Sequence, residues 1–259
     1  MTAKILYLDL EISSNQSIIE NYGLKLWYSR MAASSITRDF VIFCASWQWI
    51  SGGPDTKVHN VCVDPSDVFD DKNVVATVWE LLNEANVVCG HNLRGFDKKK
   101  FNTRAIFHGF FPPSPYATVD TLSIARSQFG FTSNKLAYLA KYLDLPAKDE
   151  APDWKLVIDG DAKEIKRMVK YCNQDITTGV AVYKKLAPWD PTHPNLNNYK
   201  DGVEHGCPSC GSNHLHKNKK YTRKNGDVVQ SYRCEDCGQY SSDSFKYKKI
   251  KAAFKQLKA

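Results

Sequence analysis

The sequence lacks any hydrophobic run long enough to cross a membrane. A membrane-spanning helix needs about 20 consecutive apolar residues, and no stretch of the 259 residues approaches that length. The first residues lead directly into a strand-like pattern and contain no apolar core of a signal peptide. Internal repeats and low-complexity tracts are also missing. These absences favour a cytoplasmic protein that has no membrane partner.

The composition is that of a folded chain with charge concentrated at one end. Hydrophobic residues make up 42% and charged residues 24%, which is typical of a globular protein. The whole net charge of +7 lies in residues 191–259, which contain 13 Lys and Arg but only 6 Asp and Glu. A neutral body with a basic end predicts contact with a polyanion such as nucleic acid, although a lysine-rich tail can also serve solubility.

The pattern of apolar residues predicts an α/β fold. Strands are expected at residues 4–10, 24–28, 40–50, 58–63, 87–90 and 117–120, and helices at 73–85, 97–108, 122–129, 136–143 and 161–186. Strands come first and helices alternate with short strands later, which indicates a mixed sheet flanked by helices. The expected domains are an α/β domain at 1–188, a linker at 189–204, a cysteine-containing module at 205–243 and a basic tail at 244–259.

Two carboxylates stand at the end of the first expected strand. Side chains alternate along a strand, so Asp9 and Glu11 point to the same face of the sheet. Like charges this close are unfavourable unless a cation neutralises them, and carboxylate oxygens suit a hard divalent ion such as Mg²⁺ or Mn²⁺. The pair alone is also compatible with a solvated strand end.

Two further acids lie on expected helices. Asp97 would open a helix, where the positive end of the helix dipole favours an acid, and a simple N-cap role explains it equally well. Tyr171 and Asp175 are four residues apart and therefore share one face of the long helix. Apolar neighbours surround Asp175, and a buried acid without a partner is costly.

Together these residues resemble a known family. Asp9-x-Glu11, Asn92-x-x-x-Phe96-Asp97 and Tyr171-x-x-x-Asp175 are similar, in this order, to the three exonuclease motifs of the DEDD superfamily. The histidine branch of that family would have His at the position of Lys170, so the tyrosine branch is indicated. Residues 119–122 and 135–143 are similar to segments between the motifs, and the resemblance covers about residues 4–187.

The resemblance implies a fold and a reaction. The superfamily has a ribonuclease-H-like fold and includes polymerase proofreading domains and RNase D. The resemblance implies that Asp9, Glu11 and Asp175 hold one Mg²⁺ or Mn²⁺ ion, that Asp9 bridges to a second ion and that Asp97 helps to hold this second ion through water. Two ions about 3.5–4 Å apart stabilise the attacking and leaving oxygens in phosphodiester hydrolysis. Tyr171 would orient the attacking water, so that these four acids and the tyrosine are the expected catalytic residues.

Some positions near the motifs are expected to contact nucleic acid. We expect these contacts from Leu10, Asn92 and Lys98. Lys98 belongs to a run of three lysines that either grips phosphates or forms a solvated face. Many relatives have Thr directly after the first-motif glutamate, whereas Ile12 and then Ser13 follow Glu11 here.

The module at 205–243 contains two C-x-x-C-G segments. They supply Cys207, Cys210, Cys234 and Cys237. In a chain without a secretion signal, paired cysteines favour a metal over disulfides, and four thiolates are the ligands of a tetrahedral structural Zn²⁺. Residues 220–223 and 228–233 flank an Asn-Gly pair, which is a strong hairpin signal. The module is therefore expected to be a zinc ribbon with one structural Zn²⁺.

The ribbon interleaves cations with aromatic residues. It resembles ribbons attached to transposases and other DNA-handling proteins, and phosphate contact with base stacking requires such side chains. The alternative is a ribbon that docks on the body or on a partner protein. The residues expected to contact nucleic acid are Lys220, Tyr221, Arg223, Tyr232 and Arg233.

Three functions are compatible with these features. The first is a metal-dependent 3′→5′ exonuclease, for which the ribbon favours DNA over RNA. A proofreading or repair role would need a replication or repair protein as partner. The second is an RNase-D-like exoribonuclease, and the third is a catalytically inactive nucleic-acid-binding accessory protein. The presence of all four acids and the tyrosine favours an enzyme. A small nuclease of this kind is compatible with a viral or mobile-element genome, and its location would then be the host cytoplasm.

Overall fold

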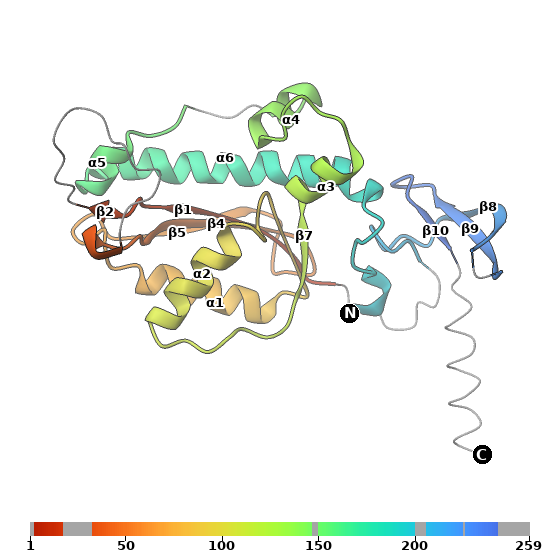
Figure 1. Cartoon of the computed structure of the whole chain (residues 1–259), viewed down its shortest axis with the longest axis horizontal. Coiled ribbons are helices and arrows are strands. Elements are labelled where there is room, and N and C mark those ends of the chain that lie inside the picture. The colour runs from red at the N-terminus through yellow and green to blue at the C-terminus, as the bar shows by residue number, and fades with distance from the viewer. Residues whose placement is uncertain (1–2, 18–32, 147–149, 200–205, 225, 243–259) are drawn as a thin grey trace, which may run out of the picture.

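A computed structural model describes residues 3–17, 33–146, 150–199, 206–224 and 226–242 (Figure 1). Its largest part is a five-stranded sheet with the strand order β5-β4-β1-β6-β7. β1 pairs antiparallel with β4 and parallel with β6, β4 pairs antiparallel with β5, and β6 pairs parallel with β7. The sheet is therefore mixed. Its strands are β1 (Ile5–Ile12), β4 (Ile42–Ser51), β5 (Val58–Cys62), β6 (Val87–Gly90) and β7 (Ala117–Asp120).

Helices cover both faces of this sheet. Figure 1 shows the long helix α6 across one face and helices α1 and α2 across the opposite face, with α3 and α4 on the side of α6. The arrangement confirms the predicted α/β fold with a mixed sheet flanked by helices. The helices are α1 (Lys72–Glu84), α2 (Asp97–Phe107), α3 (Thr121–Gln128), α4 (Leu136–Tyr142), α5 (Trp154–Ile158) and α6 (Ala162–Leu186).

The central strand β1 divides its side chains between two hydrophobic cores. Leu6 and Leu8 belong to the core that also contains the buried residues of α1, whereas Ile5 and Tyr7 belong to the core that contains Ile176 and other buried residues of α6. This is the alternation that a two-sided strand requires. Asp9 has the parity of Tyr7 and therefore faces α6.

Helix α6 approaches β1 closely because one of its residues has no side chain. A Cβ atom built on Gly179 would lie 2.2 Å from the hydroxyl oxygen of Tyr7. The helix starts with Asp161 as its N-cap, whose carboxylate accepts hydrogen bonds from the backbone N–H groups of Lys163 and Glu164. From there it presents a buried apolar stripe to the sheet, and each fully buried aliphatic side chain contributes about 1.5–3 kcal/mol.

The chain continues from α6 into a smaller three-stranded sheet. Two short 3-10 helices, η2 (Ala187–Trp189) and η3 (Leu196–Tyr199), follow α6 in the segment expected to be a linker. Leu196 is buried in the core of α6, and Tyr183 hydrogen-bonds His193 at 2.9 Å. The antiparallel sheet then consists of β8 (Leu215–Thr222), β9 (Val228–Cys234) and β10 (Tyr240–Ser242).

Most expected elements are found within two residues of their predicted ends. β6 and β7 have the predicted bounds, and β8 and β9 form the predicted hairpin, although β8 begins five residues before the predicted start at residue 220. The short helix α5 was not among the expected elements, because five residues are too few to show periodicity. The short strands β2 (Gln16–Ser17), β3 (Ile36–Arg38) and β10 were not predicted.

The strand expected at residues 24–28 and the basic tail at 244–259 lie outside the described residues. Within the described part, none of the helices combines the length and the hydropathy that crossing a bilayer requires.

Candidate functional site

The predicted site residues follow strands that end at the same edge of the sheet. β1, β6 and β7 are mutually parallel through their pairings, so their carboxyl ends meet at one edge. In open α/β sheets this edge is where ligands bind. Asp9 and Glu11 lie at the end of β1, Asn92 lies two residues after β6, and Asp120 is the last residue of β7.

A cavity of about 190 Å³ lies at this edge and brings the distant motifs together. All five expected catalytic residues line it, and so do the expected nucleic-acid contacts Leu10 and Asn92. The full lining consists of Asp9, Leu10, Glu11, His91, Asn92, Phe96, Asp97, Trp154, Tyr171 and Asp175. The cavity therefore joins residues from β1, from the loop after β6, and from α2, α5 and α6.

The two acids of β1 lie close enough together to share a cation. Ligand atoms of Asp9, Glu11 and Cys172 all lie within 4.8 Å of one another. The thiol of Cys172 donates to the backbone oxygen of Asp9 at 3.8 Å and to its Oδ2 at 3.7 Å. Cys172 was not predicted to be a site residue. Two carboxylates at this range suit a hard divalent ion.

Asp97 is a buried acid at the start of α2. Only 4% of its surface is exposed, and Phe96, not Asp97, occupies the N-cap position, so the alternative of a simple N-cap is wrong. Burial, with help from the negative charge of Asp120, raises the pKa of Asp97 to about 7, although backbone N–H groups of Asp97 and Leu10 stabilise the charged form. A cation in the cavity would favour the carboxylate.

The loop between β6 and α2 is held in place by Asp120. Its carboxylate accepts hydrogen bonds from the backbone N–H of Asn92 at 3.0 Å and from that of Arg94 at 3.0 Å. The same carboxylate caps α3 by accepting from the N–H groups of Leu122 and Ser123. Asn92 adopts a positive φ of 68°, a conformation that Asn tolerates better than most residues. Asp120 was not predicted as a site residue, and its role depends on contacts 26 and 28 residues away along the chain.

A second, larger cavity adjoins the first. Its volume is about 650 Å³, and it shares Asp9, His91, Asn92 and Asp175 with the first cavity. His91 fixes the wall between them, because its Nε2 donates to the backbone oxygen of Asn134 at 2.9 Å and its Nδ1 lies 2.9 Å from the hydroxyl oxygen of Thr121. The remaining lining consists of Leu122, Arg126, Thr132, Ser133, Asn134, Lys135, Leu136 and Ala137.

The sequence did not predict three residues that line the first cavity. His91 and Trp154 line the cavity, and Phe96 does so although it was quoted only as part of a motif. Phe96 and Trp154 remain 41% and 36% exposed, so their rings are accessible to a ligand. The sequence signal for His91 was its position directly after β6. Trp154 had no usable signal, because it is the first residue of α5, and a helix of five residues is too short to show periodicity.

Lys98, expected to contact nucleic acid, is not among the described residues that line either cavity. Its Nζ lies 5.3 Å from the ring centroid of Tyr116. Lys100 also interacts with rings, at 3.6 Å from the centroid of Phe40 and 5.8 Å from that of Phe96. Two of the three consecutive lysines therefore lie over aromatic faces.

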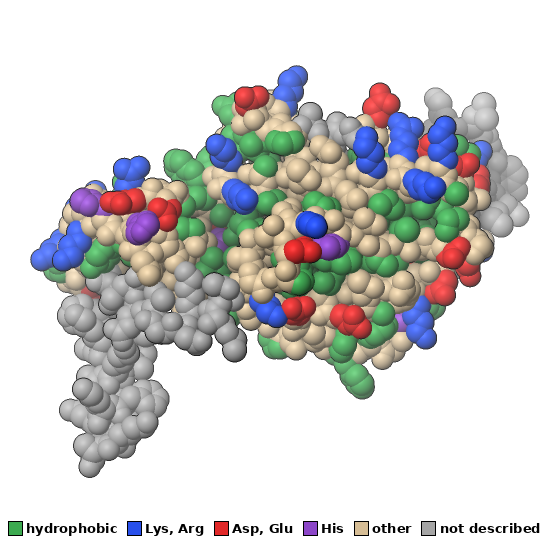
Figure 2. All heavy atoms as spheres, turned by 180° about the vertical axis from the view of Figure 1, so that it is seen from behind, with side chains coloured by type: hydrophobic (Ala, Val, Ile, Leu, Met, Phe, Trp, Pro, Cys, Tyr) green, Lys and Arg blue, Asp and Glu red, His purple; other side chains and the backbone are tan. Residues whose placement is uncertain are grey.

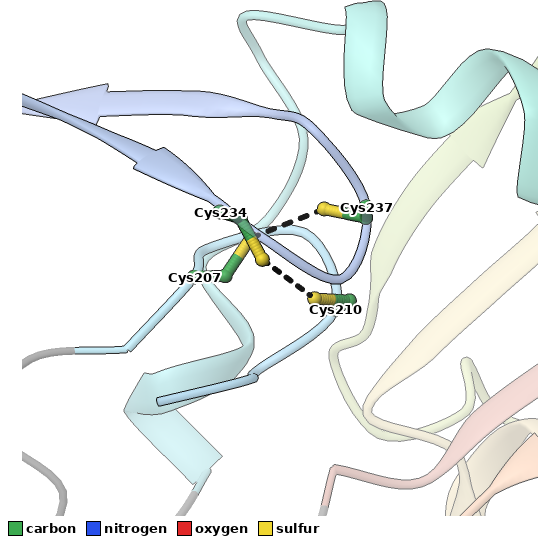
Figure 3. Close-up of side chains that lie close together, drawn as sticks. All are labelled: Cys207, Cys210, Cys234 and Cys237. Carbon is green, nitrogen blue, oxygen red and sulfur yellow. Dashed lines mark hydrogen bonds between the residues drawn. The ribbon is translucent and has the colours of Figure 1, made fainter. Parts of the chain in front are cut away.

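The four predicted cysteines converge at the base of the three-stranded sheet. Figure 3 shows their sulfur atoms pointing toward one another, with Cys207 and Cys237 3.5 Å apart and Cys210 and Cys234 3.6 Å apart. Disulfide sulfurs are about 2.05 Å apart, whereas a tetrahedral Zn²⁺ with bonds of about 2.3 Å separates its sulfur ligands by roughly 3.8 Å. The cluster could hold a structural metal such as zinc.

Burial disfavours the thiolate form of two of these cysteines. Burial raises the pKa of Cys237 to about 11 and that of Cys210 well above its ordinary value. Burial also opposes the charged form of Cys234, but backbone N–H groups of Cys237 and Asp236 outweigh it and lower the pKa of Cys234. A bound metal ion supplies the positive charge that four neighbouring thiolates need.

The expected nucleic-acid contacts of the ribbon lie on β8, on β9 and in the turn between them. Lys220, Tyr221 and Arg233 are exposed, whereas Arg223 and Tyr232 are half-buried. Backbone hydrogen bonds between Arg223 and Asp227, and between Gly226 and Arg223, close the predicted hairpin turn. Figure 2 shows lysine and arginine side chains at the outer end of this sheet and a mixture of acidic and basic side chains over the rest of that face.

No family model matches the chain, and no curated protein matches its sequence. Among solved structures, the chain is similar to the family B DNA polymerase from the hyperthermophilic archaeon Pyrobaculum calidifontis, with a TM-score of 0.51 and 16% sequence identity. The match covers 72% of this chain and 25% of the polymerase, so the chain corresponds to about a quarter of that protein's length. The similarity supports the fold.

Proposed function

We propose that this chain is a metal-dependent 3′→5′ exonuclease of the tyrosine branch of the DEDD superfamily, acting on DNA. One observation carries the proposal. Asp9, Glu11, Asp97, Tyr171 and Asp175 line one cavity although they are separated by up to 166 residues along the chain. These are the residues that the sequence resemblance selects. The superfamily includes polymerase proofreading domains, and the similar solved structure is a DNA polymerase.

The donor set fits two hard divalent cations. Asp9, Glu11 and Asp175 would hold one Mg²⁺ or Mn²⁺ ion, and Asp9 and Asp97 would hold the other, the latter through water. When bound, such a pair stabilises the attacking and leaving oxygens of an in-line displacement at phosphorus. Carboxylate oxygens are the ligands that these ions prefer, and their convergence would be unfavourable without positive charge.

Tyr171 would orient the attacking water. Its phenol lies on the same face of α6 as Asp175, one helical turn earlier, and lines the cavity. A phenol has an ordinary pKa near 10 and is a poor base at neutral pH, so its role is to hydrogen-bond the attacking water. Asn92 and Leu10 bound the same cavity and would position the 3′-terminal nucleotide.

The proposed domains of the chain are those expected from its sequence. Residues 1–188 form the exonuclease domain, 189–204 connect it to a zinc ribbon at 205–243, and a basic tail follows at 244–259. Four cysteine ligands leave no open position on Zn²⁺, so this ion is structural. The ribbon would add affinity for the nucleic acid through Lys220, Tyr221, Arg223, Tyr232 and Arg233. A replication or repair protein is the expected protein partner.

The test is digestion of 5′-labelled strands with Mg²⁺ or Mn²⁺. Single-stranded DNA, double-stranded DNA and single-stranded RNA of the same sequence are compared in parallel. The proposal expects a ladder of products that shortens by one nucleotide at a time from the 3′ end of DNA, and no products when the divalent cation is chelated. Digestion of RNA alone would indicate an exoribonuclease, and intact substrates under all conditions would indicate a binding protein without activity.

A further inference from the structure

A row of five aromatic side chains runs beside the second cavity. We call it the aromatic ladder, and its rings follow one another in the order Trp189, Phe129, Phe131, Tyr142 and Tyr138. Successive ring centroids are 5.5, 5.1, 5.2 and 6.2 Å apart. These are ordinary distances for interacting aromatic pairs.

Three rings of the ladder, including the terminal Tyr138, are half-buried, and the other two are exposed. Phe129 and Phe131 are half-buried against the core of α6, whereas Trp189 is 63% and Tyr142 65% exposed. Exposed Tyr and Trp side chains are also found at the edge of an ordinary hydrophobic core. Here the half-buried pair contacts both exposed rings, Phe129 that of Trp189 and Phe131 that of Tyr142, and so limits their movement.

The segment that carries most of the ladder has more basic than acidic side chains, and the exposed Asp144 lies directly after it. Residues 121–143 contain Arg126, Lys135 and Lys141 but no Asp or Glu, although the body as a whole is neutral. All three cations are exposed. Cations interleaved with aromatic rings are the side chains that single-stranded nucleic acid requires, because phosphates pair with the cations and bases stack on the rings.

Two of the cations near the ladder line the cavity next to the proposed active site, and the Trp189 end of the ladder adjoins the ribbon. Arg126 and Lys135 line the second cavity, which shares Asp9 and Asp175 with the first. At the far end, the residue after Trp189 accepts a hydrogen bond from Gln239 of the ribbon, at 3.4 Å from its backbone oxygen. Figure 1 shows α3 and α4 between the middle of α6 and the three-stranded sheet.

We propose that the aromatic ladder and its cations form a binding track for the single-stranded segment that precedes the 3′ end, leading it from the ribbon to the cavity. The track deepens the exonuclease function proposed above and rests on it for the direction of the strand. Sequence preference is not expected, because every base has a π-face on which a ring can stack. The track would thus supply affinity that increases with strand length.

The experiment measures this gain of affinity with length. Binding of fluorescein-labelled oligothymidylates of about 4 and about 12 nucleotides, lengths that bracket ordinary single-strand binding sites, is followed by anisotropy with the metal chelated. Tyr142→Ala and Trp189→Ala are each expected to reduce the affinity for the longer strand about tenfold, the loss of one stacked base. Affinity for the shorter strand and its rate of hydrolysis with Mg²⁺ should not change.

Two variants serve as controls. Tyr142→Phe keeps the ring and should bind like the parent. Phe111→Ala removes a ring that is 83% exposed, in the segment after α2 on the other side of the sheet, and should also bind like the parent. The track is refuted if both alanine variants retain the affinity for the longer strand, and the rings would then be assigned to contact with a protein. It is also refuted if the variants lose affinity equally for both strand lengths. If the parent shows the length effect but hydrolyses neither strand, the exonuclease function fails and the track stands.

Discussion

The sulfur of Cys172 lies 3.7 Å from Oδ2 of Asp9, although 163 residues separate the two along the chain. Cys172 is fully buried in α6, and Asp9 lies near the end of β1. The contact places this turn of α6 directly against the end of the strand. Tyr171 and Asp175 flank this cysteine on the helix and therefore reach the cavity that contains Asp9. The close approach of α6 to the sheet, permitted by Gly179, is thus what assembles the candidate site.

Removing an acid of the cavity should abolish activity without unfolding the protein. Asp9→Ala and Asp175→Ala are expected to lower the rate of metal-dependent nucleotide release by more than the roughly 10–100-fold that loss of an outer-shell partner of a metal costs. The rate is measured on a 5′-labelled strand, and far-ultraviolet circular dichroism checks the fold. Glu80→Ala, at an exposed acid of α1, is the matched control. If Asp9→Ala digests the strand as fast as the parent, the assigned site is wrong.

Removing only the hydroxyl of Tyr171 should slow the reaction and leave binding intact. Tyr171→Phe keeps the ring in the cavity but cannot hydrogen-bond the attacking water. An interaction made only in the transition state lowers kcat and kcat/KM equally, so we expect a fall in both, with KM unchanged, of about 10²-fold, the lower end of the range for proton-transfer groups. A change confined to KM would instead assign Tyr171 to substrate binding.

Loss of one cysteine of the four-cysteine cluster should release a metal ion. Cys207→Ser is expected to lose one equivalent of zinc, measured by atomic absorption, and to lose the fold of the three-stranded sheet, because small modules of this kind depend on their metal for folding. The body should keep its own unfolding transition. Cys62→Ser, at a half-buried cysteine of β5, should keep the zinc. Equal zinc contents in the two variants would contradict a Cys₄ site.

The cations of the ribbon should set part of the salt dependence of binding. The slope of log K against log salt is about −0.7 for each phosphate neutralised on a single strand. The double variant Lys220→Ala, Arg223→Ala should therefore make the slope less steep by about 1.4. Lys72→Ala together with Lys163→Ala removes two cations of the body and should leave the slope unchanged. An unaltered slope in the ribbon variant would mean that the ribbon docks on protein.

A buried ion cluster under α2 should control stability. Asp71 is fully buried, accepts two hydrogen bonds of 2.7 Å from Arg104 and one of 2.6 Å from His108, and also accepts from the backbone N–H of Ile42. Asp71→Asn leaves the charge of Arg104 without its carboxylate and should lower the free energy of unfolding by about 3–5 kcal/mol. Urea denaturation measures this, with Asp70→Asn as the control at an exposed neighbour.

The same cluster predicts how stability depends on pH. Burial by itself would raise the pKa of Asp71, but the hydrogen bonds from Arg104, from the N–H of Ile42 and from His108 outweigh it and lower the pKa below its ordinary value. A lowered pKa means that the contribution of Asp71 is complete above its unfolded pKa of about 3.9 and is lost as the pH falls through the folded pKa. Below about pH 4 the difference in stability between the parent and Asp71→Asn should therefore shrink.

The local pattern of the chain was sufficient for most of the elements and for the chemistry of the site. Alternation placed Asp9 and Glu11 on one face of a strand, helical spacing placed Tyr171 and Asp175 on one face of a helix, and the paired cysteines indicated their own cluster. These features depend on residues that are near in sequence, where the periods of helix and strand fix which side chains are neighbours. The resemblance to a family then selected the same acids that the cavity brings together.

Only the tertiary structure decided which further residues join them. The sequence carried no signal for Trp154 in the cavity or for the buried cluster of Asp71 and Arg104, whose partners lie 33 residues apart. The sequence also could not predict the pKa of about 7 for Asp97 or the aromatic ladder. Burial and ring contacts arise only when distant segments pack together. Local periodicity thus determined which side chains share a face of each segment. The packing of α6 on the sheet determined which of those faces meet.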